Sequence, residues 1–296
     1  NRISDEPVKN VDLSNRPFID KWIFARLDET TRKLEESISK YQFNIFADTL
    51  YDFVWHDVCD RYLEAIKPSI DSDPDQQTVL ANLLNSVLRI MHPVCPFITE
   101  ALWPHVRAAT KFGVAGIELP DAEILATSSW PKINLDESSS PTLIKDFDSA
   151  DQLVSLIRSA RAEQKVKPRQ TIDLYAPSHV LDLLERVNGF VQILAGIGEV
   201  YPLSEAKTEN SSVLTFEGAE IRISGLDNDV DLAAQRARLE KLITEKERQI
   251  NGFKGRLANE GYLSNAKPEI IEETRNMLAS AEADLKAAQT SLANLN

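Results

Sequence analysis

The residue types that most often carry chemistry are scattered along this sequence. Its four histidines have no metal-ligand spacing to a cysteine or to a carboxylate cluster. They are His56, His92, His105 and His179. None of the 10 glycines belongs to a glycine-rich phosphate loop. The two cysteines, Cys59 and Cys95, lie on apolar helical stretches, which favours buried free thiols over a disulfide or a metal site. We therefore expect no catalytic or metal site.

The charge pattern is more informative than the scattered polar residues. The chain of 296 residues has a formal net charge of −13, which argues against non-specific binding of nucleic acid or membrane. Two basic islands interrupt this acidity. Residues 158–169 hold five cations and one acid, and residues 230–257 hold seven cations and four acids. Each island fits either a solvated helix face or contacts to nucleic-acid phosphates.

Reading of single-stranded bases would also need exposed aromatic side chains on which bases stack. The candidates are Trp22, Tyr51, Trp55 and Tyr62. Each of them fits a helical core as well as it fits a stacking surface.

Apolar residues at three- and four-residue steps predict the helices that must position these groups. The expected helices cover residues 18–40, 44–66, 74–91 and 96–106, with a fifth at about 145–164. Short links between the first four predict an up-and-down bundle. Residues 108–141 are rich in Gly, Pro, Ser and Asp, so we expect a long excursion over the bundle surface.

The periodicity changes after Pro168. Alternation predicts a strand at 171–175, helices at 180–187 and 191–197, and a hairpin of strands at 213–216 and 221–223. Together they form a small α+β module.

The C-terminal part shows sustained heptad spacing on both sides of a break at 259–268. This pattern predicts an antiparallel coiled-coil hairpin. The fold class is therefore mainly α. The expected parts are an extended lead-in (1–15), a helical bundle (16–167), the α+β module (168–227) and a coiled-coil arm (228–296).

Several stretches resemble a known family. YDFVWHDVCDRYLEAIKP, HPVCPFITEALW, SSWP and LIRSARAEQKVKP are similar to successive motifs of the anticodon-binding helical domain of class I aminoacyl-tRNA synthetases, in the valine, isoleucine and leucine group. GRLANEGYLSNAKPEIIEETRNML resembles the hairpin arm of valyl-tRNA synthetases.

The resemblance implies a C-terminal piece without the family's catalytic and editing domains. Such a piece would be a cytoplasmic monomer that binds valine tRNA together with those domains, with no cofactor of its own, since ATP and Mg²⁺ serve the absent catalytic domain. The bundle would hold the anticodon stem-loop, and the arm would reach the outer corner where the D- and T-loops meet. The implied bundle contacts are Leu63, Trp55, Arg61, Lys67, Arg158 and Arg161. The implied arm contacts are Lys246, Arg248, Lys254, Arg256, Lys267 and Arg275.

Two alternatives remain open at this point. An isoleucyl-type synthetase shares the bundle motifs but usually lacks the paired heptad arm. A helical scaffold that docks a protein partner through its coiled coil would show binding that does not depend on salt, whereas RNA binding weakens steeply with salt.

Overall fold

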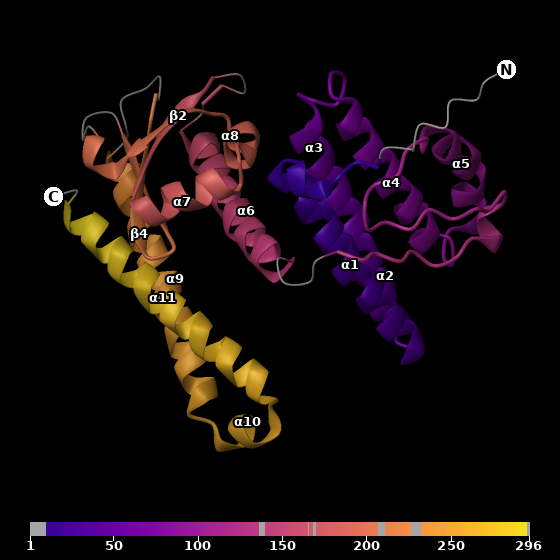
Figure 1. Cartoon of the computed structure of the whole chain (residues 1–296). Helices are drawn as coiled ribbons and strands as arrows, with labels where there is room; N and C mark the ends of the chain where they lie inside the picture. The colour runs from indigo at the N-terminus through magenta and orange to yellow at the C-terminus, as the bar shows by residue number, and fades with distance from the viewer. Residues whose placement is uncertain are drawn as a thin grey trace. The chain divides into compact units, whose positions relative to one another are not determined.

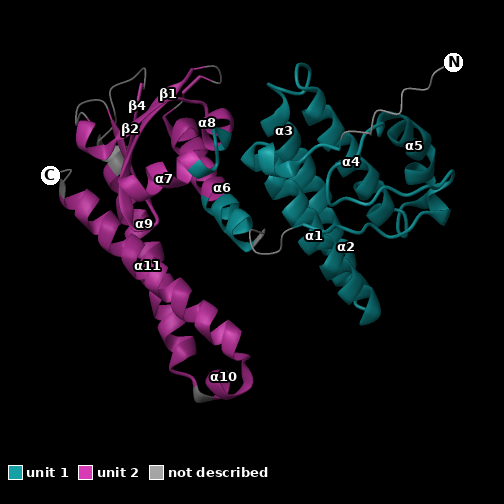
Figure 2. Cartoon of the chain, in the orientation of Figure 1, with its two compact units in different colours: residues 1–149, 186–190 teal, residues 150–185, 191–296 magenta. Residues whose placement is uncertain are grey.

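The computed structural model describes residues 10–135, 140–164, 166–167, 170–206, 211–225 and 232–294. The chain divides into two compact units (Figure 2). Unit 1 contains residues 1–149 and 186–190, and unit 2 contains residues 150–185 and 191–296. The division falls inside one helix, α6 (Ser140–Glu163). The sequence-based domain boundaries remain predictions.

Unit 1 contains the expected helices in the expected order (Figure 1). Its elements are η1 (Leu13–Asn15), α1 (Phe18–Ser39), α2 (Phe43–Tyr51), η2 (Asp52–Tyr62), α3 (Leu63–Ile66), α4 (Pro74–Met91), α5 (Pro96–Ala109) and η3 (Leu125–Thr127). The predicted second helix is continuous, but its middle part, η2, is a π-helix. Periodicity in the sequence does not predict the π-helix, because the same apolar positions also fit an α-helix.

The start of α4 follows from its first two residues. Asp73 accepts hydrogen bonds from the backbone N–H groups of Asp75 and Gln76 at 2.9 and 3.1 Å. Pro74 occupies the first turn, where its missing N–H costs nothing. The Asp73 carboxylate also pairs with Arg16 at 2.8 Å, and this hydrogen bond lowers the pKa of Asp73. The cap therefore ties α4 to the segment before α1.

A buried polar network lies at the centre of unit 1. The fully buried Asp20 accepts hydrogen bonds from the Tyr62 hydroxyl at 2.9 Å, from Gln76 Nε2 at 2.6 Å and from Arg16 Nε at 2.9 Å. Burial, with the Asp20 carboxylate beside it, raises the pKa of Tyr62 well above its usual range. The network joins α1, η2 and α4, so it fixes the register of the helix that carries the bundle candidates.

A buried cation makes several of the contacts that hold the excursion after α5. Arg89 of α4 donates to the backbone oxygens of Ser129, Glu118 and Trp130 at 2.9, 2.9 and 3.0 Å. Burial lowers the pKa of Arg89 to about 10, so the guanidinium stays charged at neutral pH. The isolated bridges Val11↔Val114 and Ile117↔Ile133 add further order. So do hydrogen bonds to α5, where Trp103 Nε1 donates to the Ala122 carbonyl and Glu100 accepts from the Leu125 and Ala126 backbone N–H groups. Hydrogen bonds between side chains of α4 and α5 and the backbone thus hold a segment that has little regular secondary structure.

Unit 2 is built around a four-stranded mixed sheet of order β2-β1-β4-β3. Its strands are β1 (Ile172–Ala176), β2 (Ile197–Pro202), β3 (Ser212–Phe216) and β4 (Ala219–Ser224), with α7 (Ser178–Arg186), α8 (Phe190–Ala195) and η4 (Leu203–Glu205) between them. The predicted strand at 171–175 and the predicted hairpin are confirmed.

Strand β2 was not predicted, and the helix expected at 191–197 was placed too far along the chain. The helix ends at Ala195 because Gly196, at φ +67°, takes a left-handed conformation and turns the chain into the sheet. Only one residue, Gly196, lies between helix and strand, so there is no polar linker for sequence patterns to detect.

The predicted coiled-coil arm is present. Helices α9 (Leu232–Leu257) and α11 (Pro268–Asn294) run side by side, and a short helix, α10 (Glu260–Asn265), forms the tip (Figure 1). Seam residues Leu239, Ile250, Ala281 and Ala288 are buried between them. At 1.5 Å per residue, the 26 residues of α9 are about 40 Å long.

Two further observations concern the cysteines and the membrane. Cys59 and Cys95 are free thiols, and both are half-buried rather than fully buried as expected. Within the described ranges, none of the helices combines the length and apolarity needed to cross a membrane.

Candidate nucleic-acid interface

The bundle candidates of unit 1 lie along the rod formed by α2, η2 and α3. Trp55 is 53% exposed and Tyr51 is 57% exposed. Their rings are stacked, with centroids 6.2 Å apart and planes 9° from parallel. Leu63, two turns further on, is half-buried. This face therefore presents a flat aromatic pair to solvent.

The other two aromatic candidates are core residues. Trp22 and Tyr62 are fully buried, so they do not offer a stacking surface. Trp22 instead stacks on Phe147 with ring centroids 3.5 Å apart. Burial separates the four aromatic residues into two pairs that sequence alone could not distinguish.

The cations on the same rod already have carboxylate neighbours. Arg61 pairs with the buried Asp57 at 3.2 Å, and its guanidinium lies 6.0 Å from the centroid of the Phe147 ring. Burial raises the pKa of Asp57, although Arg26 and Arg61 oppose the shift. Lys67 pairs with Glu64 at 2.5 Å on the surface, where such pairs contribute little and exchange readily. Lys67 is thus the more available of the two cations.

The first basic island belongs to unit 2, and its two candidates engage main-chain oxygens. Arg158 donates from Nε to the Leu194 carbonyl at 2.9 Å. Arg161 donates to the carbonyls of Gly196 and Gln170 at 3.2 and 2.7 Å, and burial lowers its pKa. These contacts position the end of α8 and the start of β1. They favour a structural role for both arginines.

The six arm candidates fall into two groups. Four of them have an acidic partner: Lys246 with Asp284, Arg248 with Glu245, Lys254 with Glu282 and Arg275 with Glu272. The other two, Arg256 and Lys267, are exposed, and no ion pair is found for them among the described residues. They flank α10 at the tip of the arm, so the arm candidates that are exposed without an ion pair among the described residues both lie at this end.

The two long helices of the arm differ in charge. Helix α9 carries seven cations and three acids, whereas α11 carries two cations and five acids. Acidic residues of α11 gather around a shallow hollow near the tip. It is lined by Glu269, Glu272, Glu273, Asn276, Met277 and Ser280. A polyanion is therefore attracted to the α9 side and repelled from the α11 side.

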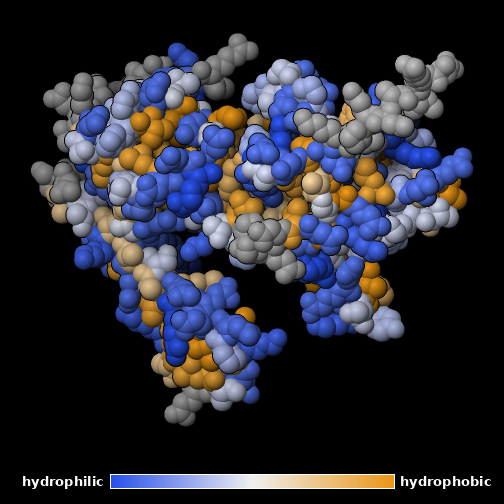
Figure 3. Space-filling view, in the orientation of Figure 1, coloured by the Kyte–Doolittle hydropathy of each residue, from blue (hydrophilic) through white to orange (hydrophobic). Residues whose placement is uncertain are grey.

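The tip combines this charge with exposed apolar surface (Figure 3). Leu263, Ile270 and Met277 are all exposed there. The tip is nevertheless ordered by Asn259, which accepts a hydrogen bond from the backbone N–H of Tyr262 at 3.1 Å. The Tyr262 hydroxyl in turn lies 2.7 Å from Thr274 Oγ1 of α11. Such a surface can contact both phosphates and unstacked bases.

A residue that sequence analysis missed fixes the root of the arm. Asp284 of α11 accepts hydrogen bonds from Lys246 Nζ at 2.6 Å and from the backbone N–H of Gly218 at 2.8 Å. Gly218 lies in the turn between β3 and β4 with φ +75°, and a Cβ there would lie 2.8 Å from Ala283 Cβ. The turn sequence Glu217-Gly218 signals the hairpin but not what packs against it.

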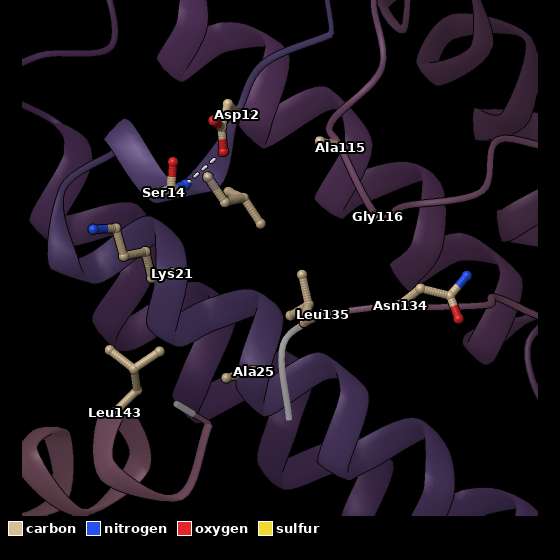
Figure 4. Close-up of a pocket in the computed structure, with 10 residues that line it drawn as sticks. Asp12, Ser14, Lys21, Ala25, Ala115, Gly116, Asn134, Leu135 and Leu143 are labelled. Atoms are coloured by element: carbon tan, nitrogen blue, oxygen red, sulfur yellow. Dashed lines mark hydrogen bonds between the residues drawn. The ribbon is translucent and has the colours of Figure 1, made fainter. Parts of the chain in front are cut away.

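A cleft of about 580 Å³ in unit 1 is the other cavity of note (Figure 4). Its lining includes the aliphatic residues Leu13, Leu135 and Leu143. The Asp12 carboxylate accepts a hydrogen bond from the Ser14 backbone N–H at 2.9 Å, which lowers its pKa. Because this carboxylate caps η1, we assign no chemistry to the cleft. No group of three or more His, Cys, Asp or Glu residues in the described part of the chain is arranged to hold a metal ion.

Comparison with protein-family models identifies both regions that carry these surfaces. Residues 20–176 match the anticodon-binding domain of tRNA ligases. Residues 231–296 match the valyl tRNA synthetase tRNA binding arm. The chain therefore belongs to the family of tRNA-ligase anticodon-binding domains.

Curated relatives define the branch of this family. Valine–tRNA ligase of Rhodopirellula baltica is 32% identical over 299 aligned residues, which cover 97% of this chain and 28% of the relative. The valine–tRNA ligase of Thermotoga maritima is 31% identical over 92% of this chain and 30% of its own length. That of Prochlorococcus marinus is 31% identical over 96% of this chain and 31% of its own length. The chain thus corresponds to the C-terminal region of valine–tRNA ligases and spans less than a third of their length.

Proposed function

We propose that this chain is the part of a cytoplasmic valine–tRNA ligase that holds valine tRNA while other domains charge it. The observation that carries the proposal is the arm, whose basic helix α9 and exposed Arg256 and Lys267 lie within the segment that matches a tRNA-binding arm. ATP and Mg²⁺ belong to the catalytic domain of the whole enzyme. The contribution of this chain is binding and orientation of the RNA.

Unit 1 receives the anticodon stem-loop in this proposal. Bases of an anticodon loop are splayed from the helix and can stack on aromatic rings. The stacked Tyr51 and Trp55 rings supply such a surface, and the half-buried Leu63 supplies an apolar contact. Lys67, an exposed cation four residues after Leu63, can contact phosphates of the loop.

The arm contacts the outer corner of the tRNA through α9 and the tip. Phosphates approach the arm from the α9 side, because α9 is basic and the opposite helix, α11, is acidic. The apolar tip residues then lie against bases of the D- and T-loops. Arg275 lies on the acidic helix and pairs with Glu272, so we rank its contribution below those of Arg256 and Lys267.

A titration tests this proposal. Binding of valine tRNA to the chain is measured at several salt concentrations, with an isoleucine tRNA in parallel. The double variant Arg256→Gln/Lys267→Gln removes two exposed tip cations. The control Arg32→Gln/Lys132→Gln removes two exposed cations of unit 1 that lie outside the proposed surfaces.

We expect salt-sensitive binding that prefers valine tRNA, and a lower salt slope for the tip variant, because each lost phosphate contact lowers the slope by about 1. The control should keep the slope of the parent chain. Equal slopes for both double variants would remove the tip from the interface. Binding that does not depend on salt would favour the protein-scaffold alternative.

A further inference from the structure

A third ring lies beside the stacked pair of Tyr51 and Trp55. The ring of His56 meets that of Tyr51 edge-on, with centroids 5.9 Å apart and planes 83° from parallel. The His56 side chain is 47% exposed, so a ligand can reach it. A neutral imidazole keeps one ring nitrogen as a hydrogen-bond donor and the other as an acceptor. The roles of these two nitrogens decide what this end of the aromatic surface can bind.

One of the two nitrogens has a partner within the helix. His56 Nδ1 lies 3.2 Å from Asp60 Oδ2, four residues further along η2. An ionised carboxylate only accepts hydrogen bonds, so in the neutral ring Nδ1 carries the proton and donates to Asp60. Nε2 of the same ring is then an acceptor without a hydrogen. The pair therefore turns an acceptor toward any ligand that reaches the second nitrogen.

The charge along this stretch disfavours a phosphate as that ligand. Residues 51–60 include three carboxylates and no lysine or arginine. Two of the carboxylates, Asp52 and Asp57, line a small cleft beside cations of α1, whereas Asp60 accompanies the rings. A phosphate would be repelled by the Asp60 carboxylate, and it offers no donor to Nε2. The N–H groups on the edge of a base suit both features.

Adenine N6 and cytosine N4 are exocyclic amino groups that donate hydrogen bonds from the edge of the base. We propose that Nε2 of His56 accepts a hydrogen bond from the amino group of an adenine or cytosine that stacks on the Tyr51 and Trp55 rings, and that Asp60 positions the imidazole. This inference deepens the proposed function of unit 1 and rests on it. It names the base chemistry that the aromatic surface selects.

A packing role for His56 gives a different expectation. If the ring only supports Tyr51 edge-on, phenylalanine at position 56 serves as well, because it keeps the ring and loses the two nitrogens. A hydrogen bond to a base is lost in the same variant. His56→Phe therefore separates the two roles without removing an aromatic side chain.

Titration of the full-length protein with valine tRNA tests the inference. One adenine or cytosine of the anticodon loop at a time is replaced by purine ribonucleoside or by pyrimidin-2-one ribonucleoside, which keep the ring and lack the amino group. The parent protein is compared with His56→Phe and Asp60→Ala at about pH 8, where an exposed imidazole is neutral. The matched control is His179→Phe, which changes an exposed histidine of α7 outside the proposed surfaces.

We expect one loop position at which loss of the amino group weakens binding to the parent protein by about 3- to 10-fold. At that position His56→Phe should bind both tRNAs with equal affinity, while His179→Phe keeps the ratio of the parent. Asp60→Ala should lower the ratio, because Nε2 can carry the proton once the carboxylate is gone. A merely structural role of Asp60 would raise both dissociation constants and leave their ratio unchanged.

Three results would overturn the inference alone. They are a ratio that survives His56→Phe, an equal loss of the ratio in His179→Phe, and tight binding of valine tRNA with no position at which the amino group matters. The salt-dependent binding of the proposed function stands in each of these cases. Absence of any binding of valine tRNA at low salt would overturn the proposed function and this inference together.

Discussion

Replacement of Asp284 by alanine should loosen the arm at its root. The carboxylate accepts from Lys246 Nζ at 2.6 Å and from the Gly218 backbone N–H at 2.8 Å, and the Asp284 and Lys246 side chains are 16% and 22% exposed. Hydrogen bonds that involve a charged group contribute about 1.5–3 kcal/mol each when buried. With partial exposure, we expect a loss of about 2 kcal/mol in the local stability of this junction.

Hydrogen exchange of the Gly218 amide measures that loss directly. A loss of about 2 kcal/mol corresponds to roughly 30-fold faster exchange, if local opening controls the rate. Asp284→Asn is the matched control, because its amide oxygen still accepts from Gly218 while the charge that holds Lys246 is gone. We expect a smaller acceleration for the asparagine variant.

The result that would refute this reasoning is unchanged exchange at Gly218 in the alanine variant. The hairpin would then be held by the packing of Gly218 against Ala283 alone. A functional consequence follows if the prediction holds. A loosened arm samples more orientations, so tRNA affinity should fall although no RNA-contacting residue has changed.

Three other predictions concern unit 1. Trp55→Ala should weaken tRNA binding by about 5- to 150-fold, since stacking contributes about 1–3 kcal/mol per base, whereas Phe43→Ala should not. Equal effects of the two variants in a binding titration would contradict the stacking assignment. The hydrogen bond from Arg16 lowers the pKa of Asp73 in the folded protein below the value of about 3.9 in the unfolded chain. The stabilisation from this hydrogen bond is therefore complete above pH values near 3.9 and is lost as the pH falls through the pKa of Asp73 in the folded protein. Asp73→Asn keeps the cap, and its urea midpoint should therefore fall less than that of the parent between pH 5 and pH 3; an equal fall would argue against this linkage. Arg89→Met should lower the free energy of unfolding by about 3 kcal/mol or more, because it leaves buried carbonyls unpaired. Denaturant unfolding measures this loss, and residues 117–133 should become open to protease. A loss below about 1 kcal/mol would contradict the role of Arg89 in holding this segment.

Helical periodicity and capping residues predicted the bundle and the arm because both are local signals. Asp73 and Pro74 mark the start of α4, and the heptads mark α9 and α11 on either side of the tip. Strand β2 was not predicted, because the left-handed Gly196 joins it to α8 without a polar linker. Local signals do not report which distant segments meet.

The candidate site shows the same limit. Sequence analysis identified candidate cations by residue type and position, but whether each cation can bind RNA depends on the groups that it contacts in the folded protein. Arg161 holds backbone carbonyls, Arg275 pairs with Glu272, and Arg256 remains exposed at the tip. Asp284 could not be predicted because its role depends on a hairpin turn 66 residues earlier.

Footprinting of valine tRNA by hydroxyl radicals, with and without the chain at low salt, tests the central claim most directly. We predict two separate protected regions, one in the anticodon loop and one at the corner formed by the D- and T-loops. The corner protection should disappear with Arg256→Gln/Lys267→Gln, while the anticodon protection stays. Uniform weak protection along the tRNA, or protection confined to the acceptor stem, would contradict the account.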